Sequence, residues 1–141
     1  LWICAAPDDP LVGSGPVSLD NLSGREILSV GQSHRISRAL REISSASDAN
    51  ISNVFTGTSL DAIRHMAATG AGVAILPSIY ALTEARRDAD LVLRPLEHPE
   101  AQRRVSLIWR PTSPMAESFS MMANILREDA EAILQHDLNG H

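Results

Sequence analysis

The sequence predicts an α/β fold built on a mostly parallel sheet. Short apolar runs alternate with stretches whose apolar residues recur at helical spacing, a pattern typical of strands joined by crossover helices. The run Val73–Leu76 holds four consecutive apolar residues, as in a strand buried on both faces. Two strand-to-helix turns, at residues 31–34 and 56–59, fall where such folds bind ligands, at strand carboxyl ends against helix N-termini.

The segment from Phe55 to Pro77 is the most informative part of the chain. After a strand end, we expect a helix capped by Thr58, with Asp61 three residues later in the capping-box position. One apolar face of this helix is formed by Leu60, Ile63 and Ala67. Two glycines and a proline then end the helix, allow a sharp turn and stop the buried strand: Gly70, Gly72 and Pro77.

The remaining elements follow from the same patterns. Further strands are expected at residues 1–6, 26–30, 51–56, 91–96 and 104–110. Pro95 places the strand at 91–96 on a sheet edge. Further helices are expected from residue 34, at 78–82 and at 115–135, with a helical turn at 18–24 and polar loops at 44–50 and 84–90. The long helix at 115–135 has an apolar face that we expect to lie in the core, formed by Met115, Phe119, Met122, Leu126 and Ile133.

Composition limits the function. The chain has 141 residues, 12 basic and 17 acidic, for a net charge of −5, with no cluster of Lys or Arg. Such a chain is poorly suited to bind the phosphate backbone of DNA directly, so any DNA contact would come from another part of the protein. No signal peptide or membrane-spanning run is visible, so we expect no membrane partner. Because the chain begins at Leu1 within an expected strand, we expect it to be truncated from a longer protein.

Cys4 is the chain's one cysteine, which excludes an internal disulfide framework and a cysteine-based zinc site. In an apolar strand it is expected to be an inert core residue. We expect no metal and no cofactor. We also expect a cytoplasmic protein, since a single cysteine suits a reducing compartment. Catalytic motifs are also missing: the sequence has no P-loop, no dinucleotide fingerprint, no G-x-S-x-G and no H-E-x-x-H.

The two strand-to-helix turns supply the candidate effector-binding residues: Gln32, Ser33, His34, Arg35, Thr58 and Ser59. Ser33, Thr58 and Ser59 can bind a ligand through their hydroxyls or simply cap helices. His34 can add charge as the pH falls, or lie on the surface. Arg35 can pair with a carboxylate ligand, or be a solvated or dimer-contact side chain.

The segment Thr58–Pro77 resembles the T-S-L-x-x-h-x-x-M-h-A-x-G-x-G-h-x-h-L-P pattern (h apolar) of LysR-type transcriptional regulators. Residues 16–28 and 105–111 resemble two further segments of that family's effector-binding domain, in the same order. The resemblance implies a periplasmic-binding-protein-like (type II) fold of two Rossmann-like lobes, with part of the first lobe missing. Residues 1–104 would form lobe II, and residues 105–141 the return strand and C-terminal helix of lobe I. The winged helix-turn-helix would lie upstream, outside this chain.

Within that family, the chain resembles the peroxide-sensing OxyR branch. That branch carries the motif G-H-C-x-R-D-Q, whose cysteine reacts with peroxide; here the matching stretch is Gly-Gln-Ser-His-Arg-Ile-Ser, residues 31–37. Gly31 and Arg35 match, but Ser33 stands at the cysteine position and a hydroxyl cannot follow the sulfenic acid route. We therefore expect a relative that senses something else, or a peroxide sensor with an engineered Cys-to-Ser change at Ser33.

The resemblance gives our leading hypothesis: a ligand-sensing regulatory domain that binds a small effector between two lobes and so changes dimer and DNA-binding geometry. It further implies DNA contact only through the missing N-terminal domain, and self-association through the C-terminal helix as a homo-oligomer. Two alternatives stay open. One is a two-lobed solute-binding protein for transport, and the other is a small α/β enzyme, which the missing catalytic motifs disfavour.

Overall fold

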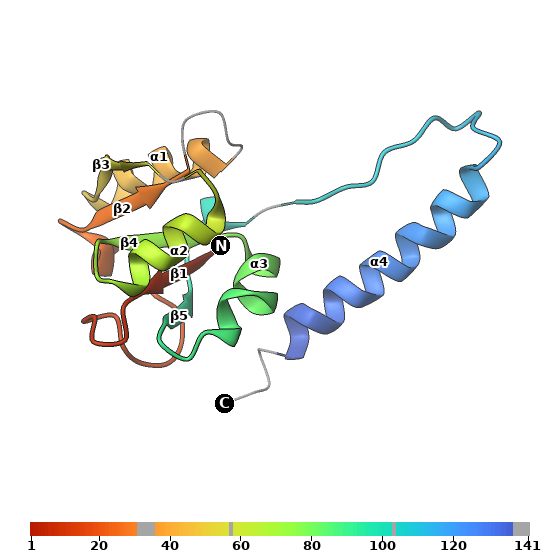
Figure 1. Ribbon diagram of the computed structural model, residues 1–141. Coiled ribbons are helices and arrows are strands. Elements are labelled where there is room, and N and C mark those ends of the chain that lie inside the picture. The colour runs from red at the N-terminus through yellow and green to blue at the C-terminus, as the bar shows by residue number, and fades with distance from the viewer. Residues whose placement is uncertain (31–35, 57, 103, 137–141) are drawn as a thin grey trace. The chain divides into compact units, whose positions relative to one another are not determined.

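The computed structural model describes residues 1–30, 36–56, 58–102 and 104–136. The chain divides into two compact units, residues 1–103 and residues 104–141, which are described separately below. The first unit contains the sheet, and Figure 1 labels its strands and helices. Its strands are β1 (Trp2–Ala5), β2 (Glu26–Ser29), β3 (Asn50–Thr56), β4 (Val73–Leu76) and β5 (Val92–Pro95).

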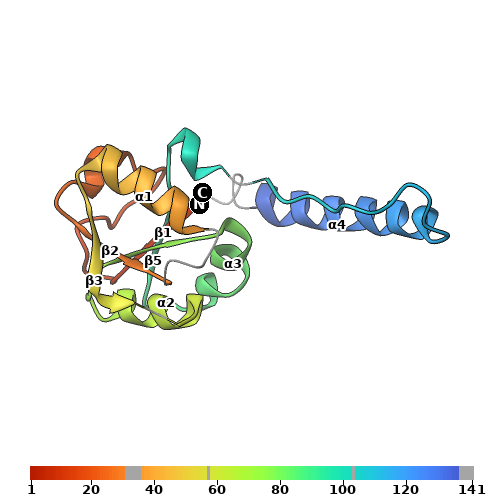
Figure 2. The same ribbon diagram turned by 90° about the horizontal axis from the view of Figure 1, so that it is seen from above.

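Helices cover both faces of this sheet. The helices of the first unit are α1 (Ile36–Ser47), α2 (Leu60–Ala68) and α3 (Ser78–Thr83), with 3₁₀ turns η1 (Leu19–Leu22), η2 (Ala85–Arg87) and η3 (Pro99–Ala101). In Figure 2 the sheet is seen between α1 on one side and α2 on the other. This is the layered α/β arrangement that the alternation of strand and helix patterns predicts.

The sheet is mixed, and the strand order is β3-β2-β4-β1-β5. β2 pairs in parallel with β3 and β4, whereas β1 pairs antiparallel with β4 and β5. Of the described strands, β1 alone runs opposite to the others, but it lies between two of them and so makes two of the four pairings antiparallel. The expectation of a mostly parallel sheet is therefore wrong for half the pairings. A crossover helix between two strands is what makes them run in parallel. The connection from β1 to β2 holds nothing longer than a 3₁₀ turn, so it does not require β1 to run in the same direction as β2.

The core is apolar and centres on β4. All four of its residues are fully buried, as the apolar run predicts, and they pack with side chains from β1, β2, α1 and α2. Gly72 precedes this strand with φ +155°, and a Cβ there would lie 2.7 Å from the Glu26 carbonyl oxygen. Only glycine allows β4 to enter the sheet so close to β2.

Two predicted element boundaries are wrong. The polar residues at 44–50 were expected to form a loop, but α1 continues to Ser47 and β3 begins at Asn50. Ser47 Oγ donates to the Ile43 carbonyl at 2.7 Å, and Ser44 Oγ donates to the Ala49 carbonyl at 2.7 Å. Ser47 bonds back to its own turn and Ser44 bonds forward to the residue before β3, so both serines are compatible with a helix end, which a polarity pattern alone does not reveal.

The second unit contains α4 (Ala116–His136), close to the helix predicted at 115–135. The strand predicted at 104–110 does not form, and Val105 and Ile108 are 80% and 91% exposed. A strand requires a neighbouring backbone for its hydrogen bonds, and no partner segment pairs with these residues within the described chain. The rings of Trp109 and Phe119 are in contact, with centroids 6.3 Å apart.

The apolar face of α4 is not core within this chain, contrary to the prediction. Met115, Met122 and Leu126 are about half exposed, and Phe119 and Ile133 are partly buried. The apolar residues of α4 do recur at helical spacing, but their burial requires a second surface that packs on them. The described part of this unit offers only residues 104–115, which precede the helix. None of the described helices, α4 included, is both long and apolar enough to cross a bilayer.

Candidate functional site

The carboxyl ends of β2, β3, β4 and β5 share one edge of the sheet, because these four strands run in the same direction. Ligands bind at this edge in open α/β sheets. Gln32, Ser33, His34 and Arg35, predicted on the turn after β2, lie outside the described residues, so their role stays a prediction. Thr58 and Ser59, on the turn after β3, are described and exposed.

Ser59, not Thr58, caps α2. The Ser59 backbone is extended (φ −150°, ψ 167°), and its Oγ accepts a hydrogen bond of 3.1 Å from the Ala62 amide. The cap position is the residue immediately before the helix, and α2 begins at Leu60. The predicted cap at Thr58 is therefore wrong by one residue. Thr58 is exposed at the same turn.

An open depression of about 740 Å³ lies farther along the same edge, at the ends of β4 and β5. Its lining combines apolar and polar side chains: Leu1, Trp2, Ser78, Pro95, Leu96, Glu97, His98, Pro99, Ala101 and Gln102. His98 Nδ1 accepts a hydrogen bond of 3.2 Å from the Glu100 amide, which orients the imidazole at the start of η3. Sequence reasoning missed this depression because three segments distant in the chain form it.

Cys4 offers no reactive thiol at this site. It lies fully buried in β1, and burial raises the pKa of the thiol to about 12, so the thiolate that reacts with peroxides is scarce at neutral pH. The prediction of an inert core cysteine is consistent with this geometry. Among the described residues, no group of three or more His, Cys, Asp or Glu side chains is placed to hold a metal ion.

The chain matches the family model described as LysR substrate binding domain over residues 1–131. It therefore belongs to the LysR substrate-binding domain family, as the sequence predicts. The hydrogen peroxide-inducible genes activator of Dickeya chrysanthemi is 31% identical over 121 residues, covering 86% of this chain and 39% of the relative. The DNA-binding transcriptional dual regulator OxyR of Escherichia coli K12 is 28% identical over 120 residues, covering 85% and 39%. The chain thus spans about two fifths of the length of these curated relatives.

Solved structures agree with this assignment. The reduced form of OxyR is 26% identical, with a TM-score of 0.69 over 90% of this chain and 58% of that one. A cysteine-to-serine mutant of Corynebacterium glutamicum OxyR, with hydrogen peroxide bound, shares the fold at 24% identity and a TM-score of 0.76, over 99% and 44%. The predicted periplasmic-binding-protein-like α/β fold is confirmed, and the chain is a LysR-type, OxyR-like substrate-binding domain. These comparisons favour a regulator over the transport alternative.

Proposed function

We propose that this chain is the ligand-sensing part of a cytoplasmic LysR-type transcription regulator and has no enzymatic activity or cofactor of its own. The family match over residues 1–131 is the observation that carries the proposal. The sheet edge with its Ser59-capped helix provides donors and acceptors for a small polar effector. The curated relatives named above are regulators rather than enzymes.

The effector would bind between two lobes, of which residues 1–104 form the second. The division of the chain at residues 103 and 104 supports this assignment, as does the position of Leu1 and Gln102 beside one open depression. Residues 105–141 would then complete the first lobe together with a segment outside this chain. An effector that prefers one lobe arrangement shifts the population toward it, and this shift would change how paired DNA-binding domains sit on an operator.

Effector binding would be non-covalent rather than an oxidation of the protein. Ser33 stands where the peroxide-sensing branch has its cysteine, and Cys4 is buried with its pKa raised to about 12. Serine has no sulfur to oxidise, and the buried Cys4 thiol forms little of the reactive thiolate at neutral pH. Hydrogen peroxide itself can still be the bound effector, because the Corynebacterium glutamicum mutant that binds it also carries serine in place of cysteine.

The wider assembly is part of the same proposal. DNA would be contacted only by an N-terminal domain outside this acidic chain. Self-association would involve α4, whose exposed apolar side chains include Met121, Met122 and Ile125. Exposed apolar surface of this kind is typical of a helix that is covered by another surface in the complete protein.

The proposal is tested by footprinting the full-length regulator on its own promoter, alone and with hydrogen peroxide or a panel of small carboxylates. We expect the protected region to change in length or position with one of these compounds. Removal of the compound by gel filtration serves as the control: a non-covalent effector response reverses without any reducing agent. A footprint that is occupied but unchanged by every compound would contradict the sensing function.

A further inference from the structure

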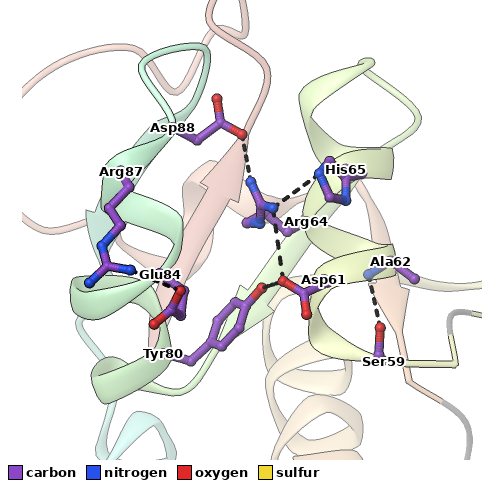
Figure 3. Close-up of polar contacts among 9 residues, drawn as sticks. All are labelled: Ser59, Asp61, Ala62, Arg64, His65, Tyr80, Glu84, Arg87 and Asp88. Carbon is purple, nitrogen blue, oxygen red and sulfur yellow. Dashed lines mark hydrogen bonds and ion pairs between the residues drawn. The ribbon is translucent and has the colours of Figure 1, made fainter.

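A polar cluster joins α2 to the segment formed by α3 and η2 (Figure 3). We define Asp61, Arg64, Tyr80 and Asp88 as the α2 latch. Tyr80 Oη donates a hydrogen bond of 2.5 Å to the Asp61 carboxylate, and Arg64 Nη1 donates one of 2.5 Å to Asp88 Oδ2. Tyr80 donates from α3 to α2, whereas Arg64 donates from α2 to Asp88, the residue after η2. The two hydrogen bonds therefore have opposite donor directions.

Arg64 is the central member of the latch. Its side chain is only 14% exposed; Nη2 lies 3.0 Å from His65 Nε2 and 3.8 Å from Asp61 Oδ1. Burial alone would lower the pKa of Arg64, but Tyr80, Asp88 and Asp61 together raise it above its ordinary value. Arg64 Nε is buried and lacks a hydrogen-bond partner among the described residues, so the guanidinium is held by its two terminal nitrogens alone.

The apolar contact of α2 with the core is small. The helix has nine residues, of which Ile63 and Ala67 are fully buried, while Leu60 and Met66 pack partly buried against the core. The latch bonds add contacts from α2 to a second segment, and they fix the side of the helix that carries Asp61 and Arg64.

The latch and the candidate site share one helical turn. Ser59 caps α2, and Asp61 follows in the first turn, so a rotation of that turn moves both side chains together. Figure 3 shows Ser59 and Asp61 on the same end of the helix, with Tyr80 reaching Asp61 from α3. Movement at the ligand edge can therefore reach the α3–η2 segment through two hydrogen bonds.

We propose that Tyr80 is a positioning residue, which orients the first turn of α2, with its Ser59 cap, for the effector and couples effector occupancy to the α3–η2 segment through the α2 latch. This proposal rests on the proposed function for the identity of the site. The coupling between the Ser59 cap and the α3–η2 segment, however, can be measured without a ligand. If the coupling exists, it is reciprocal: a change at the Ser59 cap alters the η2 end, and loss of the Tyr80 hydroxyl alters the cap.

Tyr80→Phe tests the coupling, since it removes one hydroxyl and keeps the ring. Thr83→Val is the matched control, because the Thr83 hydroxyl donates only to the Ile79 carbonyl within α3. In the full-length protein, native-state hydrogen exchange at Ala62 reports the cap, and exchange at Arg87 and Asp88 reports η2. We expect Tyr80→Phe to speed exchange at Ala62 about fivefold and Thr83→Val to leave it unchanged.

The reciprocal experiment separates positioning from general stabilisation. Ser59→Ala should speed exchange at Arg87 and Asp88, and it should lose this effect when Tyr80→Phe is already present. If Ser59→Ala leaves η2 exchange unchanged, or acts equally with and without the Tyr80 hydroxyl, the coupling is refuted.

The two proposals can fail separately. If hydrogen peroxide shifts the wild-type footprint, Tyr80→Phe should raise the half-effective concentration about fivefold relative to Thr83→Val. An equal response of the two variants would overturn the positioning role. If the wild-type footprint responds to no compound, the proposed function fails, while the exchange experiment still decides the latch.

Discussion

Tyr80 is the chain's single tyrosine, so its ionisation can be followed directly by tyrosinate absorbance. Burial and the hydrogen bond to Asp61 raise the pKa of Tyr80 to about 12 from the ordinary 10.0, while Arg64 acts in the opposite direction. Asp61→Ala removes one cause and leaves burial. We expect the titration midpoint of this variant to fall between 10.0 and about 12.

The pKa shift also predicts the pH dependence of stability. The pKa is raised in the folded state, so the stabilisation is fully present below pH 10.0 and lost as the pH rises through about 12. A shift of this size corresponds to at most about 2.7 kcal/mol, and solvent screening of the half-buried ring reduces it to about 1 kcal/mol. Urea unfolding of wild type and Asp61→Ala at rising pH measures the difference. A midpoint near 10 in wild type, with native circular dichroism retained, would refute the reasoning.

Three further predictions test the fold and the cap. Gly72→Ala should lower the free energy of unfolding by about 2 kcal/mol or more, because the added Cβ meets the Glu26 carbonyl at 2.7 Å; an unchanged urea midpoint would contradict this contact. Ser59→Ala should cost about 1 kcal/mol in thermal or urea unfolding, and Thr58→Ala much less; equal losses would mean the cap is misassigned. Arg94→Lys should cost about 1–2 kcal/mol, since lysine cannot reach the four carbonyls that the guanidinium bonds, and a wild-type unfolding midpoint would show those bonds to be dispensable.

Patterns of local sequence predicted the elements that depend on local sequence. Val73–Leu76 was assigned correctly because four apolar residues between a glycine turn and a proline fit a buried strand and little else. Pro95 correctly placed β5 at an edge, since proline cannot donate to a further strand. The family pattern across Thr58–Pro77 correctly identified the class of domain.

Long-range contacts could not be predicted in this way. Arg94 in β5 donates to backbone carbonyls of Leu11, Ser14, Gly15 and Pro16, and backbone acceptors leave no mark on the residue types of a loop. The Asp61–Tyr80 bond and the depression at the ends of β4 and β5 also join segments distant in sequence. The unformed strand at 104–110 is the converse case: its pattern is correct for a strand, but the partner is not in the described chain.

The two edge strands of the sheet, β5 and β3, differ in the contacts beside them, and this difference bears on how the domain can move. Beside β5, the Val17 amide donates to the Pro95 carbonyl at 2.8 Å, and the Glu97 amide donates back to Val17 at 2.9 Å. Arg94 also donates to carbonyls of the loop that precedes Val17. Backbone groups at the β5 edge are therefore already hydrogen-bonded to this segment. β3 forms the opposite edge and precedes the turn of the candidate site, where orientation depends on a cap and two side-chain bonds. Substitutions near β5 should therefore act on global stability, whereas those around α2 should act on local opening and on the response to effector.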